Sequence, residues 1–163
     1  MTTADQTAFR NAMAQFASGV TIVTTRDAEG TPKGFTASAF SSLSLDPPLI
    51  LVCLDRKADS HAAFEAAEHF AVSILAEGQG ETAMRFARSG ADKFGGFEVE
   101  PGSVTGMPVI PGALAHLECR MHDRLPGGDH TILVGEVLFA HTDERLRPLL
   151  HYNRAFGSFA PQD

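Results

Sequence analysis

The sequence has no tryptophan and only two cysteines among its 163 residues. Cys53 and Cys119 form no C-x-x-C pair, so nothing indicates a disulfide framework or a structural zinc site. Basic residues are also scarce. Thirteen lysines and arginines stand against 20 acidic residues, and the net charge of −7 argues against a nucleic-acid-binding surface. No apolar run approaches the ~20 residues of a membrane span, and the N-terminus shows no signal-peptide pattern. We therefore expect a cytoplasmic protein without membrane or nucleic-acid partners.

The length fits a single domain, residues 1–163, and its 12 phenylalanines indicate an aromatic core. Apolar segments of strand length recur between turn residues, whereas few segments have helical periodicity. Strands are predicted at 20–25, 33–40, 49–54, 70–75, 113–123 and 130–140, and helical segments at 61–69 and 81–88. Because strands and helices do not alternate regularly, the pattern predicts a mainly β protein, either a barrel or a sandwich.

Residues 4–18 are predicted to form an amphipathic helix. Its apolar stripe has helical spacing and consists of Phe9, Ala12, Met13, Phe16 and Val20. Thr3 and Gln6 have the spacing of a capping box, and Gly19 suits the end of the helix. We expect this helix to pack on the barrel and to carry no chemistry.

The strand predicted at 113–123 alternates between two faces. Its apolar face consists of Ala115, Leu117, Cys119 and Met121, and its polar face of His116, Glu118, Arg120 and His122. Three of these polar residues could suggest a metal site. An exposed face of a half-buried strand explains the same alternation, so no metal site is predicted.

A segment rich in small hydroxyl residues, 34–48, leads through Pro47 and Pro48 into the apolar run 49–54. Small side chains let a flat ligand approach the backbone, and serine and threonine hydroxyls both donate and accept hydrogen bonds. The same composition also suits a loop whose hydroxyls bond to their own backbone. Composition alone leaves both interpretations open.

Three motifs resemble those of the short-chain flavin reductases, the reductase components of two-component flavin-dependent monooxygenases. The first, Gly34-Phe35-Thr36-Ala37-Ser38-Ala39 followed by S-x-S-x-x-P-P-L, is similar to the flavin-binding segment of that family. The second and third are Gly128-Asp129-His130, similar to its G-D-H strand, and Tyr152-Asn153-Arg154, similar to its C-terminal Y-x-R element. They occur in the order and at the spacing of the family. The resemblance implies an antiparallel, Greek-key, FMN-binding split β-barrel with a few flanking helices.

The resemblance also implies a set of flavin-binding residues. The ring and ribityl chain would be lined by Thr36, Ala37, Ser38 and Ala39, with help from Ser42 or Ser44. The border of the site would consist of Cys53, Asp55, Arg56 and Lys57. Ser60 would meet the phosphate at a helix N-terminus, although an ordinary N-cap explains it equally well. Phe94, in the Asp92-Lys93-Phe94 segment, would line the pocket of the isoalloxazine or nicotinamide ring; the alternative is that it packs beneath a long loop.

His130 is the candidate catalytic residue. In the resembled family this position lies near the nicotinamide, where a neutral imidazole can hydrogen-bond the carboxamide. The alternative is a structural histidine at a strand start. The resemblance implies that Tyr152 and Arg154 lie near the pyridine nucleotide or near the flavin of the dimer partner, and an arginine fork suits pyrophosphate. Relatives often carry a second basic or aromatic residue where this chain has Asn153.

The resulting hypothesis is a homodimeric NAD(P)H:flavin oxidoreductase that uses NADH or NADPH to reduce FMN or FAD. Reduced flavin would then leave for a separate monooxygenase. No G-x-G-x-x-G motif follows a strand, so a Rossmann site is not expected. The alternatives are a flavin- or haem-binding split-barrel module without turnover, and a flavin-dependent reductase of another large substrate such as a corrinoid.

Overall fold

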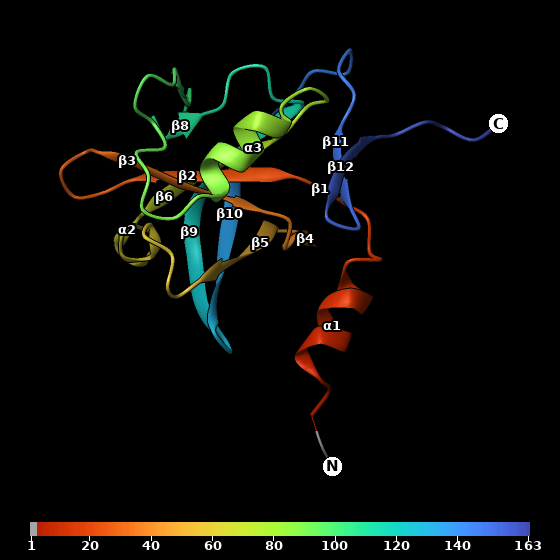
Figure 1. Ribbon diagram of the computed structural model, residues 1–163. Helices are drawn as coiled ribbons and strands as arrows, with labels where there is room; N and C mark the ends of the chain where they lie inside the picture. The colour runs from red at the N-terminus through yellow and green to blue at the C-terminus, as the bar shows by residue number, and fades with distance from the viewer. Residues whose placement is uncertain (1–2) are drawn as a thin grey trace.

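A seven-stranded antiparallel sheet, with the spatial order β3-β2-β6-β9-β10-β5-β4, curls around the main hydrophobic core (Figure 1). The protein is represented by a computed structural model that describes residues 3–163. The strands of this sheet are β2 (Thr21–Arg26), β3 (Pro32–Ala37), β4 (Phe40–Leu45), β5 (Pro48–Asp55), β6 (His69–Ile74), β9 (Ala115–Gly127) and β10 (His130–Thr142). The predicted mainly β, split-barrel fold is confirmed.

The remaining elements flank this sheet. Three strands, β1 (Ser18–Gly19), β11 (Leu149–Tyr152) and β12 (Ala155–Ser158), form a small sheet, and β7 (Glu100–Pro101) pairs with β8 (Pro108–Val109). The helices are α1 (Gln6–Met13), α2 (His61–Ala66) and α3 (Gly80–Ala87). Figure 1 shows α3 lying across the large sheet, where Ala83 and Phe86 join a second apolar cluster. None of the described helices is both long and apolar enough to cross a membrane.

The main core forms where strands of the curled sheet bring apolar side chains to a shared inner face. Phe70 of β6 lies against Gly135 of β10, where an added Cβ would overlap the ring and approach Cys119 Cβ to 3.0 Å. Phe64 of α2 closes the core by edge-on contact with Phe35, at 5.2 Å between ring centroids. A glycine is therefore needed at 135 to admit the phenylalanine ring.

Helix α2 ends at Ala66, three residues before the predicted end, because His69 already belongs to β6. The guanidinium of Arg124 on β9 donates to the carbonyls of Phe64 and Ala67 at this helix end. An arginine there satisfies carbonyls that have no partner within the helix.

Helix α1 differs from the prediction in both extent and packing. Asp5 is its N-cap and accepts a hydrogen bond from Ala8 N at 2.9 Å, so the predicted Thr3–Gln6 capping box is wrong. The apolar stripe exists, but Phe9, Met13 and Phe16 remain 60, 53 and 73 % exposed. Figure 1 shows the helix apart from the barrel. The prediction that α1 packs on the barrel of its own chain is therefore wrong.

The hydroxyl-rich segment was expected to bend after a return strand 33–40, but it forms a second strand, β4, at the edge of the sheet. Its partner β5 buries Ile50, Val52 and Leu54 and leaves the alternate side chains half-buried. The segment 49–54 is thus covered on one face only. The segment 130–140 is apolar on both faces, which predicts a strand covered on both sides; this prediction fails in the second half of the strand, where Leu138 is exposed.

Glu118 on β9 is fully buried, so the predicted exposed polar face is wrong at this position. Its carboxylate accepts hydrogen bonds from Ser103 Oγ, from the backbone N–H groups of Val104 and Thr105, and from Thr105 Oγ1. Burial alone would raise its pKa, but these hydrogen bonds hold the pKa below its usual value. Glu118 therefore anchors the loop that folds over this face.

Candidate functional site

Two cavities meet at the side chain of Cys53, near the end of β5. The strand-end cavity, of about 290 Å³, lies among β3, β5, the start of β10 and the end of α3; the predicted residues lining it are Thr36, Cys53, Asp55, Lys57 and His130. The helix-side cavity, of about 590 Å³, lies between β5 and α1; the predicted residues lining it are Ser38, Ala39, Cys53 and Arg154. The structure thus gathers most of the predicted residues around one thiol. Burial raises the pKa of Cys53, which keeps that thiol neutral.

Ser38 and Ala39 link β3 to β4 and form the floor between these cavities. Their carbonyls accept hydrogen bonds from Phe40 N at 2.9 Å and Cys53 N at 3.0 Å. Within residues 3–163, neither the Ser38 nor the Ala39 N–H group donates to a protein acceptor. Ala37 points into the main core instead. Two unpaired amide donors on an exposed link fit the pyrimidine edge of a flavin, which offers carbonyl and nitrogen acceptors.

The Thr36 side chain makes a hydrogen bond to α3 that was not expected from the sequence. Its hydroxyl donates to the carbonyl of Ala83 in α3, at 2.6 Å. The hydroxyl proton is therefore engaged, and only the oxygen lone pairs remain for a ligand. This bond fixes the middle of α3 against β3.

The strand-end cavity is lined by the cationic side chains of Lys57 and Arg88, which form no ion pair within the described residues. Its acidic residues are engaged by backbone groups, since Asp55 accepts from Lys57 N at 2.8 Å and Asp59 accepts from Gly90 N. In the described chain, the side chains of Lys57 and Arg88 make neither a hydrogen bond nor an ion pair. Free lysine and arginine groups beside backbone-bonded carboxylates favour a phosphate ligand.

His130 is the first residue of β10, opposite Asp55 of β5, and lines the strand-end cavity. Its Nδ1 lies 2.7 Å from Asp129 Oδ1. This hydrogen bond lowers the pKa of Asp129, with a smaller contribution from Lys57. Because an ionised carboxylate can only accept, Nδ1 is the donor of this hydrogen bond, and in the neutral form of the ring Nε2 is therefore an acceptor. His130 is thus held in one tautomer at the cavity wall.

Tyr152 and Arg154 belong to the hairpin between β11 and β12, which attaches α1 to the barrel. Arg154 donates to Asn11 Oδ1 at 2.7 Å, and Tyr152 donates to Gln15 Oε1 at 3.0 Å. Asn153 and Arg154 have φ angles of 46° and 64°. The left-handed region costs a β-carbon residue about 1 kcal/mol, and a hairpin turn of this kind usually has glycine at the second position. A strained arginine beside a cavity indicates a functional use.

Ser60 and Phe94 line a third cavity, of about 270 Å³, which shares Asp59 and Lys93 with the strand-end cavity. Ser60 occupies the N-cap position of α2 but makes no capping bond, and its buried Oγ has no partner within the described residues. Phe94 packs edge-on against Phe86, with 5.0 Å between ring centroids. The other predicted residues lie outside the three cavities: Ser42 and Ser44 on β4, Arg56 on an exposed loop, and Tyr152 on the hairpin.

The strand-end cavity also contains four polar residues that were not among the predicted site residues, Asp59, Arg88, Ser89 and Lys93. Lys93 Nζ donates to Gly34 O at 3.0 Å, and burial lowers the pKa of this amine, with Asp59 opposing the shift. Arg88 ends the predicted helical segment 81–88, whereas Ser89 and Lys93 lie in a loop-like stretch in which the Asp92-Lys93-Phe94 segment is the sequence signal. Among residues 3–163, no cluster of three potential metal ligands occurs.

Comparisons with known proteins agree with this geometry. A family model described as flavin reductase like domain matches residues 13–160. The chain is 48% identical over 155 residues to the actinorhodin polyketide dimerase of Streptomyces coelicolor, with 95% of this chain and 87% of that protein covered. It is 44% identical over 154 residues to the NADH:riboflavin 5'-phosphate oxidoreductase of Streptomyces pristinaespiralis, with 94% and 88% covered.

A solved structure gives the same result. The NADH:FAD oxidoreductase of Streptomyces globisporus, in complex with NAD and FAD fragments, superposes with a TM-score of 0.90 at 40% identity. The match covers 96% of this chain and 94% of that one. Since the family model spans nearly the whole sequence and the relatives match over most of their own length, the chain belongs to the flavin reductase like domain family.

Proposed function

We propose that this protein is an NAD(P)H:flavin oxidoreductase that reduces FMN or FAD and supplies reduced flavin to a separate monooxygenase. The observation that carries the proposal is the meeting of the two cavities at Cys53, with free backbone amides on one side and an oriented histidine on the other. A similar protein of Rhodococcus opacus, 45% identical over 157 residues, is the reductase component of 4-nitrophenol 4-monooxygenase/4-nitrocatechol 2-monooxygenase. The single domain would act in the cytoplasm, where NADH and reduced thiols occur together.

The residues of the site divide between the two ends of a flavin. The N–H groups of Ser38 and Ala39 would hold the pyrimidine edge, and the Cys53 side chain would contact the ring. Lys57 and Arg88 would meet the phosphate, and the unpartnered hydroxyl of Ser60 lies in the neighbouring cavity. The bound flavin supplies the hydride-accepting ring. The protein needs no general base for this chemistry, so its contribution is to place the two rings at close range.

His130 would orient the nicotinamide. Its Nε2 would accept a hydrogen bond from the carboxamide N–H₂, while Asp129 holds the opposite side of the ring. Arg154 would contact the pyrophosphate of the same nucleotide from the helix-side cavity. The two residues approach from different elements, β10 and the β11–β12 hairpin, and together they would fix both ends of the nicotinamide half.

We further propose a homodimer that completes the site. The stripe of Phe9, Met13 and Phe16 is exposed, and β4 presents Leu43 and Leu45, which are 50 and 91 % exposed, at an unpaired sheet edge. Apolar groups in this number on one side of a small protein are typical of an interface. A second copy would cover the helix-side cavity and exclude water from it. Light scattering at micromolar concentration should give twice the 17.4 kDa chain mass, and a stable monomer with bound flavin would contradict the dimer.

The activity is tested by His130→Ala, with His122→Ala as an exposed control on β9. The wild-type protein should oxidise NADH only when FMN or FAD is present. His130→Ala should leave flavin affinity nearly unchanged and slow anaerobic flavin reduction by NADH ~10- to 100-fold, about 1.4–2.8 kcal/mol of transition-state stabilisation. Dithionite should still reduce the flavin. Absence of NADH oxidation with either flavin would instead favour a binding module without turnover.

A further inference from the structure

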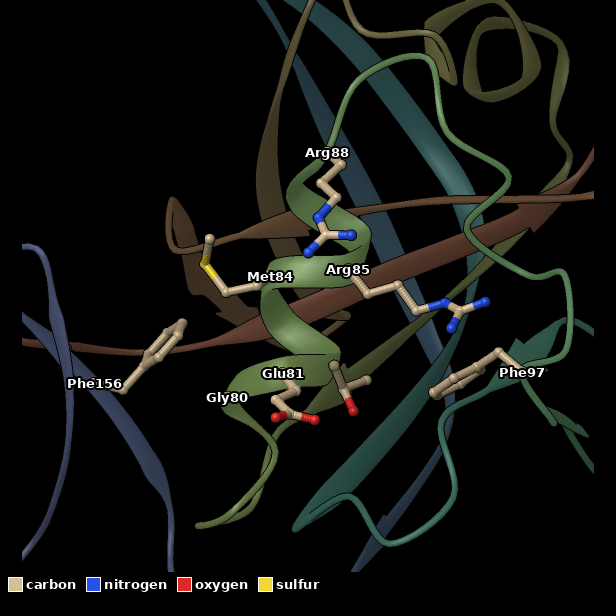
Figure 2. Close-up of a pocket in the computed structure, with 8 residues that line it drawn as sticks. Gly80, Glu81, Met84, Arg85, Arg88, Phe97 and Phe156 are labelled. Carbon is tan, nitrogen blue, oxygen red and sulfur yellow. The ribbon is translucent and has the colours of Figure 1, made fainter.

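A further cavity, of about 760 Å³, follows the exposed side of α3 and is separate from the two cavities that meet at Cys53. We call it the α3 groove. Its lining residues are Gly80, Glu81, Thr82, Met84, Arg85, Arg88, Phe97 and Phe156. Figure 2 shows Met84 and Phe156 on one side of the helix and Arg85 and Phe97 on the other. Arg88 lines both this groove and the strand-end cavity, so the two spaces meet at its side chain.

Arg88 is suited to bind a phosphate at this junction. It follows the last residue of α3 and is exposed, and no hydrogen bond or ion pair engages it within the described chain. The neighbouring Arg85, by contrast, donates to the carbonyls of Lys93 and Gly95 and is fixed by them. A free guanidinium between two cavities can contact a pyrophosphate that passes from one to the other.

The groove also offers flat and apolar surfaces for a base. Arg85 is held with its guanidinium carbon 5.3 Å from the centroid of the Phe97 ring, which forms a planar shelf. Met84 and Phe156 remain 52 and 40 % exposed on the opposite side. Purine rings stack on aromatic and guanidinium planes. These exposed apolar and planar groups can therefore contact a purine base.

Glu81 supplies the third element of a nucleotide site. It lies seven residues before Arg88, two helical turns or ~10 Å along the axis. Figure 2 shows its carboxylate and the Arg88 guanidinium projecting from the same side of α3. A carboxylate accepts hydrogen bonds from ribose hydroxyls, as acidic residues do in other dinucleotide sites. Arg88 and Glu81 thus lie toward opposite ends of the groove, and the surfaces that suit a base flank the helix between them.

We propose that the α3 groove binds the adenosine 5'-phosphate end of a dinucleotide whose redox ring occupies the site at Cys53. This inference rests on the proposed function. The same chemistry has two sources, because FAD and NAD(P)H both carry an adenosine phosphate. If FAD is the source, the groove selects FAD over FMN; if NAD(P)H is the source, it anchors the hydride donor.

Calorimetric titration with AMP tests the groove without measuring turnover. The first variant, Arg88→Gln, removes the positive charge where the groove meets the strand-end cavity. The second, Met84→Glu, places a carboxylate in the groove, at a residue that does not line the strand-end cavity. Arg26→Gln, on the β2–β3 turn, is the control. AMP should bind the wild type and the control, and each groove variant should weaken it ~10-fold or more. No AMP binding to the wild type at millimolar concentration would overturn the proposal, as would equal binding to all proteins.

Two further measurements identify the source. If it is FAD, Met84→Glu should weaken FAD binding ~10-fold and leave FMN binding unchanged in a fluorescence-quenching titration. If it is NAD(P)H, Met84→Glu should raise the KM for the nucleotide with FMN as acceptor, and AMP should compete with NADH. An unchanged FAD-to-FMN ratio together with an unchanged KM would refute the groove. A protein that binds AMP but reduces no flavin would instead refute the proposed function.

Discussion

Replacement of Glu118 by glutamine should destabilise the protein by about 3 kcal/mol. The carboxylate is fully buried and accepts four hydrogen bonds, from Ser103 Oγ (3.1 Å), Val104 N (3.0 Å), Thr105 N (2.6 Å) and Thr105 Oγ1 (2.7 Å). Hydrogen bonds to a charged group contribute about 1.5–3 kcal/mol each, and an unsatisfied buried donor costs about 1–3 kcal/mol. An amide N–H₂ facing the two backbone donors removes at least one of these bonds and leaves a donor unpaired.

For a chain of this size, a loss of 3 kcal/mol lowers Tm by roughly 6–12 °C. Thermal unfolding of Glu118→Gln should show this decrease, and hydrogen exchange should become faster at Val104 and Thr105. His122→Gln, an exposed change on the same strand, should stay within ~0.5 kcal/mol of the wild type. A Glu118→Gln protein that melts within 2 °C of the wild type would refute the anchoring role.

The contribution of Glu118 to folding stability should decrease as the pH falls. The pKa of Glu118 is lowered from its ordinary value of 4.5, so its ionised form is stabilised in the folded state. A lowered carboxyl pKa contributes stability that is present above the unfolded value and is lost as the pH falls through the folded value. The difference in Tm between the wild type and Glu118→Gln should therefore be greatest near neutral pH and should shrink below pH 4.5.

Three other substitutions test separate features. Gly135→Ala should cost ~1–3 kcal/mol in urea unfolding, because the added Cβ overlaps the Phe70 ring; a neutral result would show that the core can shift there. Arg154→Gly should relieve the left-handed backbone, so Tm should stay equal or rise by a few degrees while the KM for NADH increases; a lower Tm with an unchanged KM would assign Arg154 a structural role only. Ser60→Ala should not destabilise the ligand-free protein, because its buried hydroxyl has no partner, and should weaken FMN binding more than riboflavin binding; equal weakening would separate Ser60 from the phosphate.

The sequence allowed the strands to be predicted because their periodicity depends on local chemistry. It did not show what covers each face. The stripe of Phe9, Met13 and Phe16 indicates that α1 has an apolar side, but periodicity does not say whether that side packs on its own chain. Glu118 follows the polar alternation of its strand, yet a loop from residues 103–105 closes over it. Both errors concern contacts between segments distant in the sequence.

In the candidate site, too, the residues within local motifs were predicted, whereas those brought in by contacts between distant segments were not. Thr36, Cys53 and His130 were suggested by motifs and do line one cavity. Arg88 ends the predicted helical segment 81–88 but was not selected as a site residue; the packing of α3 on β3, which includes the Thr36–Ala83 hydrogen bond, brings it to that cavity. The strand β4 was missed because a run of serines has low strand propensity. Its pairing with the apolar β5 outweighs that preference.

Because Cys53 lies where the two cavities meet, chemical labelling of its thiol can report whether a ligand is bound there. The chain has two thiols, and Cys119 is buried, with burial raising its pKa to about 12. Cys53 is half-buried and lines both cavities. At alkaline pH, which offsets the raised pKa of Cys53, a small alkylating reagent should therefore label a single position in the native protein, with no engineered cysteine. The labelling rate would follow access to the junction of the cavities, so mass spectrometry of the intact chain could record ligands that have no colour or fluorescence.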